Sequence, residues 1–472
     1  MASKAYDLIL VGSGFASTFF LHRALQKLGP DARILVLESG RRDTHAWQLQ
    51  NRSNSSIPYQ DTYENRSPRK PWVYNPGFGG SSNCWWACTP RMLPADFELR
   101  SRYGVGRDWP LSYDSLEDYY CEVEDLMSVS GPSEDSPFPR SRPYPQPPHN
   151  LTDPDKILKK GHPTGFFVQP TARARVPTSR RGPCCATSTC RLCPINAKFT
   201  IQNEMAHLFE DSRVTLELEA TAQQVLMEAG DAKGVIYRKG DRDIEVRGQA
   251  VALGANAIFN PWLLQRSGFK HPLLGQCLTE QASITLTADL DGVDNFQGST
   301  SITGHGYLHY DGDHRRDRAA ALIETMNIPN LRHEKGRWRQ RMQFKFIFEN
   351  LLETSNSVES TGQKPTTTWK GDTSYAKKSI SIVRELAESF LKPLPVERIQ
   401  VPGRLNQTES HILCTTVMGV DPNDSIVDAG LIHHTARNLL VLGGSVFPTA
   451  SPANPTLTLS ALSLMAADRF LS

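Results

Sequence analysis

The pattern of apolar and polar residues at the start of the chain predicts a strand, a turn, a helix and a second strand. Residues 8–11 form a short unbroken apolar run, and residues 34–37 form another. Runs of this kind are typical of parallel strands that are buried on both faces. Between them, after a glycine-rich turn, the apolar residues recur at helical spacing. The sequence therefore predicts a parallel α/β arrangement at this end of the chain.

Similar patterns predict the later elements. These are an acidic, aromatic helix in 108–131, two strand-like runs in 214–237, a strand, turn and helix in 250–269, β-rich residues in 298–312, helices in 331–353 and 377–394, and a strand, glycine pair and helix in 438–470. Residues 131–183 are rich in Pro, Ser and Arg and are predicted to be an extended excursion, either a plain surface loop or a lid or docking arm.

These elements predict a mixed α/β fold class, with a Rossmann-like cofactor-binding domain and a second domain built on a β-sheet. The cofactor-binding domain is expected to be discontinuous and to consist of residues 1–50, 200–290 and 405–472. Residues 51–199 would contain a loop that contacts the cofactor, the proline-rich excursion and a cluster of cysteines, and residues 291–404 would form the second domain. A chain of 472 residues is long enough for this organisation.

Composition narrows the classes of function. The formal net charge of +2 favours neither nucleic acid nor an acidic membrane as a partner. No apolar run reaches the roughly 18–20 residues that span a bilayer, so we expect no direct membrane insertion. The N-terminus lacks the basic region and cleavage site of a signal peptide. We therefore expect a cytoplasmic protein, or one that is exported only with a partner subunit.

The turn after the first strand has the pattern of a dinucleotide-binding site. It reads Gly12-Ser13-Gly14-Phe15-Ala16-Ser17. Gly12 permits a tight turn, Gly14 lets the backbone approach a pyrophosphate, and Ser17 lets helix and strand pack closely. Glu38, at the end of the second strand, can accept hydrogen bonds from ribose hydroxyls. A purely structural turn is the alternative, and the turn alone does not separate FAD from NAD.

Four blocks along the chain resemble the glucose–methanol–choline (GMC) family of FAD-dependent oxidoreductases. They are "GFGGSSNCWWACTPRM" at 77–92, "DWPLSYDSLEDYYCEVEDLMSVSG" at 108–131, "AVALGANAIFNPWLLQRSGF" at 250–269, and the C-terminal stretch from His411 onwards. The resemblance implies GMC architecture, FAD as cofactor, and residues 291–404 as the substrate-binding domain. Besides Gly12, Gly14, Phe15, Ala16, Ser17 and Glu38, it implies FAD contacts at Gly79, Gly80, Ser81, Ser82, Asn83, Val225, Gly254, Gly444, Ser445, Asn454, Pro455 and Thr456.

The same resemblance assigns catalysis to two residues near the C-terminus. His411 matches the family's catalytic histidine, and Asn454 matches the second residue of the family's active pair. A histidine suits removal of a hydroxyl proton because its pKa lies near neutrality, while the flavin accepts the hydride. The amide would hydrogen-bond and orient the substrate oxygen. From the residues alone, Asn454 could simply cap its helix, and we expect His433 and His434 to be solvated.

Four of the nine cysteines lie close together, at Cys184, Cys185, Cys190 and Cys193. Adjacent cysteines fit one tetrahedral zinc ion poorly, and a disulfide between neighbours is strained. Thiols bunched in one loop and followed by proline are typical of iron–sulfur sites, and basic neighbours favour thiolate. Structural thiols, zinc and a disulfide stay open as alternatives.

This stretch is also similar to the "CC…C…CP" stretch of one GMC branch, the membrane-linked bacterial FAD glucose and fructose dehydrogenases. That resemblance implies an iron–sulfur cluster, [3Fe–4S] in preference to [4Fe–4S]. Its ligands would be Cys184, Cys185 and Cys190, with Cys193 as a fourth ligand or a spectator. Electrons would then leave the flavin for an external acceptor protein, and a small partner subunit is a further expected partner.

The sequence thus predicts an FAD-dependent dehydrogenase that oxidises a sugar, a polyol or a related alcohol by hydride transfer. Three rivals stay open. An oxidase would return the electrons to O2 as peroxide and leave the cysteines structural. A lyase would keep FAD only as a structural group. An electron-transfer subunit with a vestigial pocket would show no turnover.

Overall fold

A computed structural model describes residues 5–472, and its largest sheet has seven strands. β1 (Tyr6–Val11) lies between β2 (Ile34–Leu37) and β8 (Arg242–Leu253) and is parallel to both, as the apolar runs predict. The strand order is β5-β2-β1-β8-β7-β6, and β16 also pairs with β8. The other strands are β5 (Val214–Glu217), β6 (Thr221–Glu228), β7 (Asp231–Lys239) and β16 (Leu439–Val441). Residues 1–4, part of the N-terminus considered above, lie outside the described residues.

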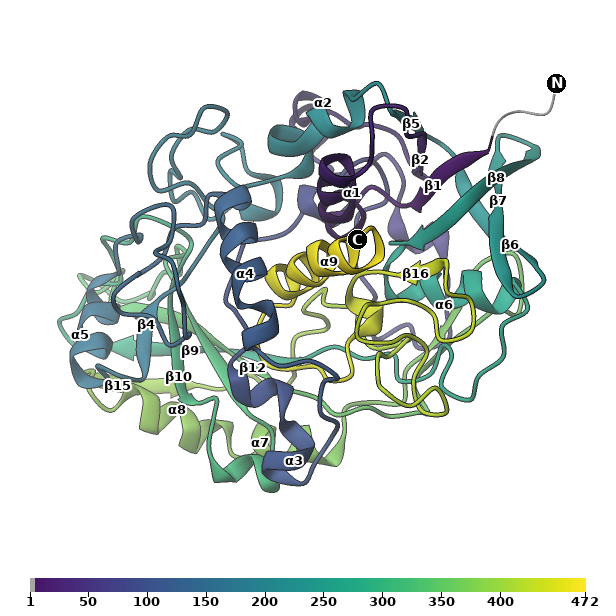
Figure 1. Cartoon of the computed structure of the whole chain (residues 1–472). Helices are drawn as coiled ribbons and strands as arrows, with labels where there is room; N and C mark the ends of the chain where they lie inside the picture. Colours follow the sequence, from purple (N-terminus) through teal and green to yellow (C-terminus); the bar gives the residue numbers. More distant parts are fainter. Residues whose placement is uncertain (1–4) are drawn as a thin grey trace.

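The two ends of the chain pack together beside this sheet. The closing helix α9 (Thr456–Phe470) lies between α1 (Phe15–Lys27) and α4 (Asp114–Met127) in Figure 1. Most residues of α9 are buried, because its apolar side chains surround the helix axis rather than forming one stripe. The strand, turn and helix predicted in 250–269 appear as the end of β8 and α6 (Asn256–Arg266).

A second sheet of six strands has the order β15-β9-β12-β11-β10-β4. Its strands are β4 (Phe166–Val168), β9 (Ala282–Leu290), β10 (Ile302–His309), β11 (Ala321–Met326), β12 (Arg341–Phe348) and β15 (Val396–Gln400). One face packs into an apolar core with α7 (Ser374–Ser381) and α8 (Val383–Leu391). The alternate side chains point away from that core, as strand geometry requires.

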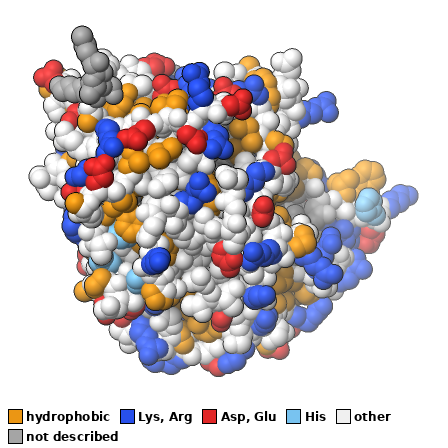
Figure 2. Space-filling model, turned by 90° about the vertical axis from the view of Figure 1, so that its right-hand side faces the viewer, with side chains coloured by type: hydrophobic (Ala, Val, Ile, Leu, Met, Phe, Trp, Pro, Cys, Tyr) orange, Lys and Arg blue, Asp and Glu red, His pale blue; other side chains and the backbone are white. Residues whose placement is uncertain are grey.

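The remaining described elements are short. They are α2 (His45–Asn51), α3 (Leu99–Tyr103), α5 (Asp153–Gly161), and a small sheet of β3 (Glu64–Asn65), β13 (Ser357–Glu359) and β14 (Thr366–Thr368). Within residues 5–472 no helix is long and apolar enough to cross a bilayer. On the face drawn in Figure 2, acidic and basic side chains are interspersed, in keeping with the small net charge.

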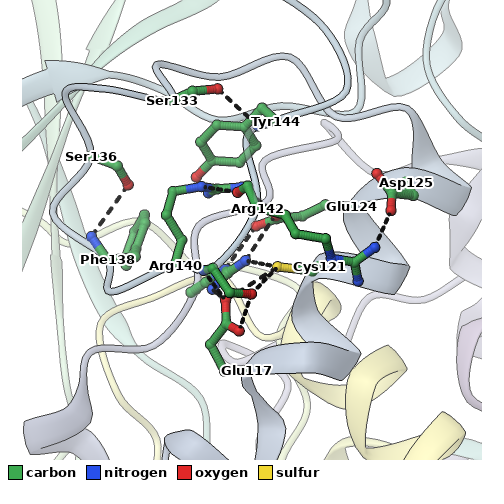
Figure 3. A network of polar contacts seen from close by, with 12 residues as sticks. Glu117, Cys121, Glu124, Asp125, Ser133, Ser136, Phe138, Arg140, Arg142 and Tyr144 are labelled. Atoms are coloured by element: carbon green, nitrogen blue, oxygen red, sulfur yellow. Dashed lines mark hydrogen bonds and ion pairs between the residues drawn. The ribbon is translucent and has the colours of Figure 1, made fainter.

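The proline-rich segment 131–183 is more ordered than its composition predicts, since it contains α5 and β4. Its first part is fastened to α4 by a buried network, shown in Figure 3. Glu124 accepts hydrogen bonds from Arg91 at 2.8 Å and from Arg140 at 2.8 Å. The guanidinium of Arg140 also lies over the ring of Tyr144. Buried charges held in this way fix the segment against the helix.

Two of the helix predictions are corrected by the structure. Residues 341–348, inside the helix predicted over 331–353, form strand β12 because Met342, Phe344, Phe346 and Phe348 alternate with polar residues and enter the core. The helix predicted over 377–394 begins earlier and is divided at Ile382 into α7 and α8.

The expected solvation of the His433–His434 pair is also wrong for one member. His433 is buried and packs on the ring of Phe269, and burial lowers its pKa to about 4.

Candidate active site

A cavity of about 1160 Å³ lies between the two large sheets. The carboxyl ends of β1, β2 and β8 form one part of its wall, and residues of β9, β11 and β12 form another. In open α/β sheets, ligands bind outside the carboxyl ends of the strands. The cavity exceeds the roughly 300–1,000 Å³ of a typical small-ligand site, so a cofactor and a substrate can share it.

The glycine turn stands at the edge of this cavity. Gly12 has a φ of +96°, and a Cβ there would lie 2.6 Å from the carbonyl oxygen of Gly254. A Cβ on Gly254 would lie 2.0 Å from Ser17 Oγ, so these residues pack without room for a further side chain. A Cβ on Gly14 would meet no atom within 4 Å, and Gly14, Phe15 and Ala16 line the cavity. Gly14 thus leaves space for the close approach of a ligand.

Glu38 joins the glycine turn to the loop before Gly79. Its carboxylate accepts hydrogen bonds from the backbone N–H of Ser13 at 3.1 Å, of Gly40 at 2.9 Å and of Gly77 at 3.2 Å. The side chain is buried at the end of β2 and lines the cavity. It therefore stands at the position where the sequence predicts a ribose contact, and it also fixes the backbone around that position.

The predicted flavin loop, residues 79–83, is divided between the cavity and the protein interior. Gly79 is left-handed, with a φ of +83°, and the short helical turn that follows brings Gly80 and Ser81 to the cavity wall. Ser82 and Asn83 turn away from the cavity: the Ser82 hydroxyl donates to the Gly79 carbonyl, and the Asn83 amide donates to the Phe78 carbonyl. Ser82 and Asn83 are thus placed to shape the loop.

The other predicted cofactor contacts also fall into residues that line the cavity and residues that do not. Gly254, Gly444, Asn454, Pro455 and Thr456 line the cavity. Ser17, Gly79, Val225 and Ser445 are not part of its wall. The Val225 N–H donates to Ser267 Oγ at 2.9 Å, and the preceding residues 221–223 reach the wall instead.

His411 lines the cavity and its ring orientation is fixed by Gln281. The amide nitrogen of Gln281 donates to the carbonyls of Ser451 and Ala453, at 2.7 and 3.1 Å. The amide oxygen therefore faces His411 Nδ1 at 3.1 Å and must accept a hydrogen bond from a protonated Nδ1. This tautomer leaves Nε2 unprotonated. Burial lowers the pKa of His411 to about 4, so the imidazole is neutral at neutral pH.

Asn454 lies on the loop that Gln281 also contacts, just before α9. It is 7% exposed, and its Oδ1 has no hydrogen-bond partner among the described residues. A buried amide oxygen without a partner is costly, which suggests that a bound group completes its hydrogen bonds. The helix-cap alternative receives no support, because no side-chain cap hydrogen bond occurs at the start of α9.

Sequence reasoning missed several polar residues of the cavity. Thr285, Glu324 and Lys345 come from three neighbouring strands of the six-stranded sheet, and Glu409 lies two residues before His411. Lys345 forms ion pairs with Glu324 at 2.9 Å and with Glu409 at 2.7 Å. Only strand pairing brings these residues together, so their spacing in the sequence carries no motif. Gln281 was missed for the same reason.

None of the four clustered cysteines is part of the cavity wall, although their neighbour Arg191 is. Within residues 5–472, no group of three or more Cys, His, Asp and Glu side chains is placed to hold a metal ion. The four sulfurs as they stand are therefore not arranged around one metal site. Cys185 is exposed, and the other three sulfurs contact Ser301 Oγ at 2.9 Å (Cys190), Thr300 Oγ1 at 3.6 Å (Cys184) and the Ala197 N–H at 3.3 Å (Cys193).

Two buried cations lie beside this cysteine loop. Lys198, 3% exposed, donates to four backbone carbonyls, and burial lowers its pKa to about 8. Arg173, 2% exposed, lies 3.8 Å from Cys190 Sγ. Among the described residues neither forms a salt bridge with a carboxylate. Buried cations without an anionic partner are costly, so thiolates nearby would stabilise them.

The residues of the cavity fit FAD. The open space at Gly14 suits a pyrophosphate, Glu38 stands at the ribose position, and Asn454 offers an unsatisfied oxygen. A cavity of this size, whose wall has polar and apolar parts, also leaves space for an organic substrate.

Comparison with known proteins agrees with this arrangement. Models of the GMC oxidoreductase family match residues 71–283 and 328–463. The fold and the cavity define an FAD-dependent oxidoreductase that acts on CH–OH donors. The chain belongs to the GMC oxidoreductase family.

Individual relatives are distant but extend over almost the whole chain. The fructose dehydrogenase large subunit of Gluconobacter japonicus is 26% identical, over 99% of this chain and 98% of that protein. The 6'''-hydroxyparomomycin C oxidase of Streptomyces lividus is 24% identical, over 98% and 91%. The solved structure of pyridoxine 4-oxidase from Mesorbium loti has a TM-score of 0.69 at 17% identity, over 98% and 99%, which shows a shared fold.

Proposed function

We propose that the protein is a dehydrogenase that oxidises a sugar, a polyol or a related alcohol and passes the electrons to an external acceptor. The observation that carries the proposal is the arrangement around His411. Gln281 fixes its tautomer so that a neutral Nε2 is available, and Asn454 offers an unpartnered oxygen in the same cavity. The relatives named as a fructose dehydrogenase large subunit and a 6'''-hydroxyparomomycin C oxidase support an alcohol of this class.

The proposed chemistry needs a base and an oriented hydroxyl. When bound, FAD supplies the acceptor for the hydride of the CH–OH carbon. His411 Nε2 takes the hydroxyl proton, while the side-chain amide N–H of Asn454 donates to the substrate oxygen and holds it in place. The residues proposed to hold the cofactor are Gly12, Gly14, Phe15, Ala16, Glu38, Gly80, Ser81, Gly254, Gly444, Pro455 and Thr456. Ser17, Gly79, Ser82, Asn83, Val225 and Ser445 are proposed to shape the backbone around it.

We propose the same domain division as the sequence predicts, with residues 291–404 supplying most of the substrate domain. Two sheets support it, because the strands from 1–50 and 405–472 and most of those from 200–290 share the seven-stranded sheet. β9, at 282–290, pairs instead with the strands of the six-stranded sheet.

The route by which electrons leave is the second part of the proposal. The thiols of Cys184, Cys185 and Cys190, with Cys193, are proposed as the site of an iron–sulfur cluster, which would require the cysteine loop to rearrange. Support comes from Arg173 and Lys198, the two buried cations beside the loop, and from the relative named as a large subunit, which is consistent with a partner subunit.

Purification without oxygen tests both parts. We expect a yellow protein whose flavin bands bleach with a sugar or polyol, together with iron and sulfide near three to four atoms each per chain and an EPR signal. A yellow, bleachable protein without iron would contradict the electron route alone. A protein that binds no FAD would contradict the whole proposal.

An oxidase is the second candidate, favoured by the cysteine arrangement, since the sulfurs do not converge on a metal site. Peroxide formation at a rate equal to the rate of dye reduction would support it over the dehydrogenase. A lyase would be indicated if no alcohol bleached the bound flavin.

A further inference from the structure

The six-stranded sheet presents a row of polar side chains to the cavity. Cross-strand pairing places Thr285 on β9 opposite Lys345 on β12, and Lys345 opposite Glu324 on β11. All three line the cavity. The residues flanking Thr285 and Lys345, and Ile323 before Glu324, belong to the apolar core beneath the sheet. Side chains alternate between the two faces of a sheet, so this face is polar and lines the cavity, while the other face is apolar.

Glu324 is fully buried and faces two nitrogen groups, Lys345 Nζ at 2.9 Å from one carboxylate oxygen and His305 Nε2 at 3.7 Å from the other. Neither contact has the geometry of a hydrogen bond, so both oxygens can still accept one. Burial raises its pKa, but the facing Lys345 ammonium outweighs that effect and holds the pKa below its ordinary value, so the group is ionised. A buried carboxylate that lacks hydrogen-bond donors is costly. Donors on a bound molecule would remove that cost.

An apolar patch lies beside this polar row. Trp86, Cys88, Ile302 and Met326 pack together and line the same cavity. A cyclic sugar or polyol has C–H groups on its ring faces and hydroxyl groups around its edge. Such a ring can place a face on the aromatic and aliphatic patch while its hydroxyls donate to the carboxylate. A linear or monohydric alcohol uses only one of the two surfaces.

The net charge of the polar row also limits which substrates bind. Glu324 and Glu409 carry two negative charges, and Lys345 carries one positive charge. The excess of one carboxylate repels an anionic substrate at close range and tolerates a neutral or cationic one.

We propose that Glu324, supported by Lys345 and Glu409, recognises the hydroxyl groups of a polyhydroxylated ring, and that this row sets the substrate class of the enzyme. The inference rests on the proposed function, because it concerns the substrate of the same cavity. Neutral sugars, cyclic polyols and amino sugars are accepted, whereas monohydric alcohols and sugar acids are poor substrates.

The test measures anaerobic reduction of the bound flavin by glucose, fructose, myo-inositol, glucosamine, gluconate and cyclohexanol. For the wild-type holoenzyme, at least one neutral polyol or amino sugar should exceed both cyclohexanol and gluconate at least tenfold in second-order rate constant. In E324Q the preference for that substrate over cyclohexanol should fall about tenfold to a hundredfold, mainly through weaker half-saturation, because a charge-assisted hydrogen bond is lost.

Two further variants distinguish a loss of substrate recognition from a loss of folding. E324Q/K345M/E409Q removes all three charges of the row, which avoids an unpaired buried charge, and should show the same loss of preference. The matched control is E349Q, which alters a buried glutamate paired with Arg315 outside the cavity and should leave the preference within twofold of wild type.

Two results would overturn the inference while leaving the proposed function intact. One is wild-type enzyme that prefers cyclohexanol or gluconate, and the other is a folded, flavin-loaded E324Q or triple variant with unchanged preference. Failure of every alcohol to bleach the flavin would instead contradict the proposed function itself.

Discussion

At the scale of single residues, the chemistry depends on His411 being neutral. Its pKa of about 4 means that the base is available above that pH and is lost as the pH falls through it. The rate constant for flavin reduction should therefore be level around neutrality and reach half its maximum near pH 4 to 5, measured by stopped-flow absorbance. A half-maximum near the ordinary histidine value of about 6.5 would contradict the assignment. His411→Ala should lower the plateau about 10²- to 10⁴-fold while FAD stays bound.

Gln281 acts on the reaction through His411 and is a positioning residue. Gln281→Ala removes the acceptor that selects the tautomer, and we expect a loss of about tenfold to a hundredfold in the rate of flavin reduction. Gln281→Glu places a carboxylate beside Nδ1, which stabilises the imidazolium and raises the pKa of His411. Its pH profile should therefore shift to higher pH than that of wild type. A purely structural role would lower the rate in both variants without moving the profile.

Substitutions at two glycines of the same turn should affect cofactor binding and folding separately. Gly14→Ala adds a methyl group where no atom lies within 4 Å, so the chain should fold normally but bind FAD at least tenfold more weakly, measured by flavin titration. Gly12→Ala places a Cβ 2.6 Å from the Gly254 carbonyl oxygen in a left-handed conformation, so it should impair folding itself. Equal FAD affinity in Gly14→Ala and wild type would argue against a pyrophosphate at this turn.

At the scale of elements, helix α4 and the proline-rich segment are held together by buried charges. Glu124→Ala leaves Arg91 and Arg140 without their shared carboxylate, and the free energy of unfolding should fall by about 3–5 kcal/mol in urea titrations. The control on the same helix is Asp125→Ala, whose pair with Arg142 is half exposed and should contribute about 0–1 kcal/mol. Similar losses in the two variants would mean that the network in Figure 3 adds little stability.

The elements differ in how far the sequence predicts them. β1, α1 and β2 follow from apolar runs and a glycine turn that are local in sequence, and the structure confirms them. β12 lies in the basic stretch 331–353 that the sequence predicts as helix, and that prediction misses the period of two in its phenylalanines.

The residues of the cavity also differ in how far the sequence predicts them. Gly14, His411 and Asn454 lie in motifs and do line it. Glu324 and Lys345 meet only through pairing between strands, and Gln281 meets His411 only because the fold brings two distant loops together. The cysteine loop shows the opposite case, since its compact spacing predicts a cluster, whereas the sulfurs of the described residues do not converge on one point.

At the scale of the whole molecule, the fold brings both ends of the chain to one site. The glycine turn follows β1 near the N-terminus, while Asn454 and the start of α9 come from the C-terminus, and α1 packs against α9 (Figure 1). The six-stranded sheet supplies the opposite wall with its polar row. Cofactor and substrate would thus bind between two sheets whose strands come from separate parts of the chain.

The central claim is that this cavity holds a flavin which an alcohol reduces directly. The most direct measurement is the visible spectrum of the purified holoprotein under anaerobic conditions, before and after addition of a cyclic polyol. We expect the bands of oxidised flavin to be present at about one per chain and to disappear on mixing with wild-type protein, but to persist in His411→Ala. A colourless protein that takes up no FAD on reconstitution, or bands that survive every sugar, polyol and alcohol tried, would contradict the account.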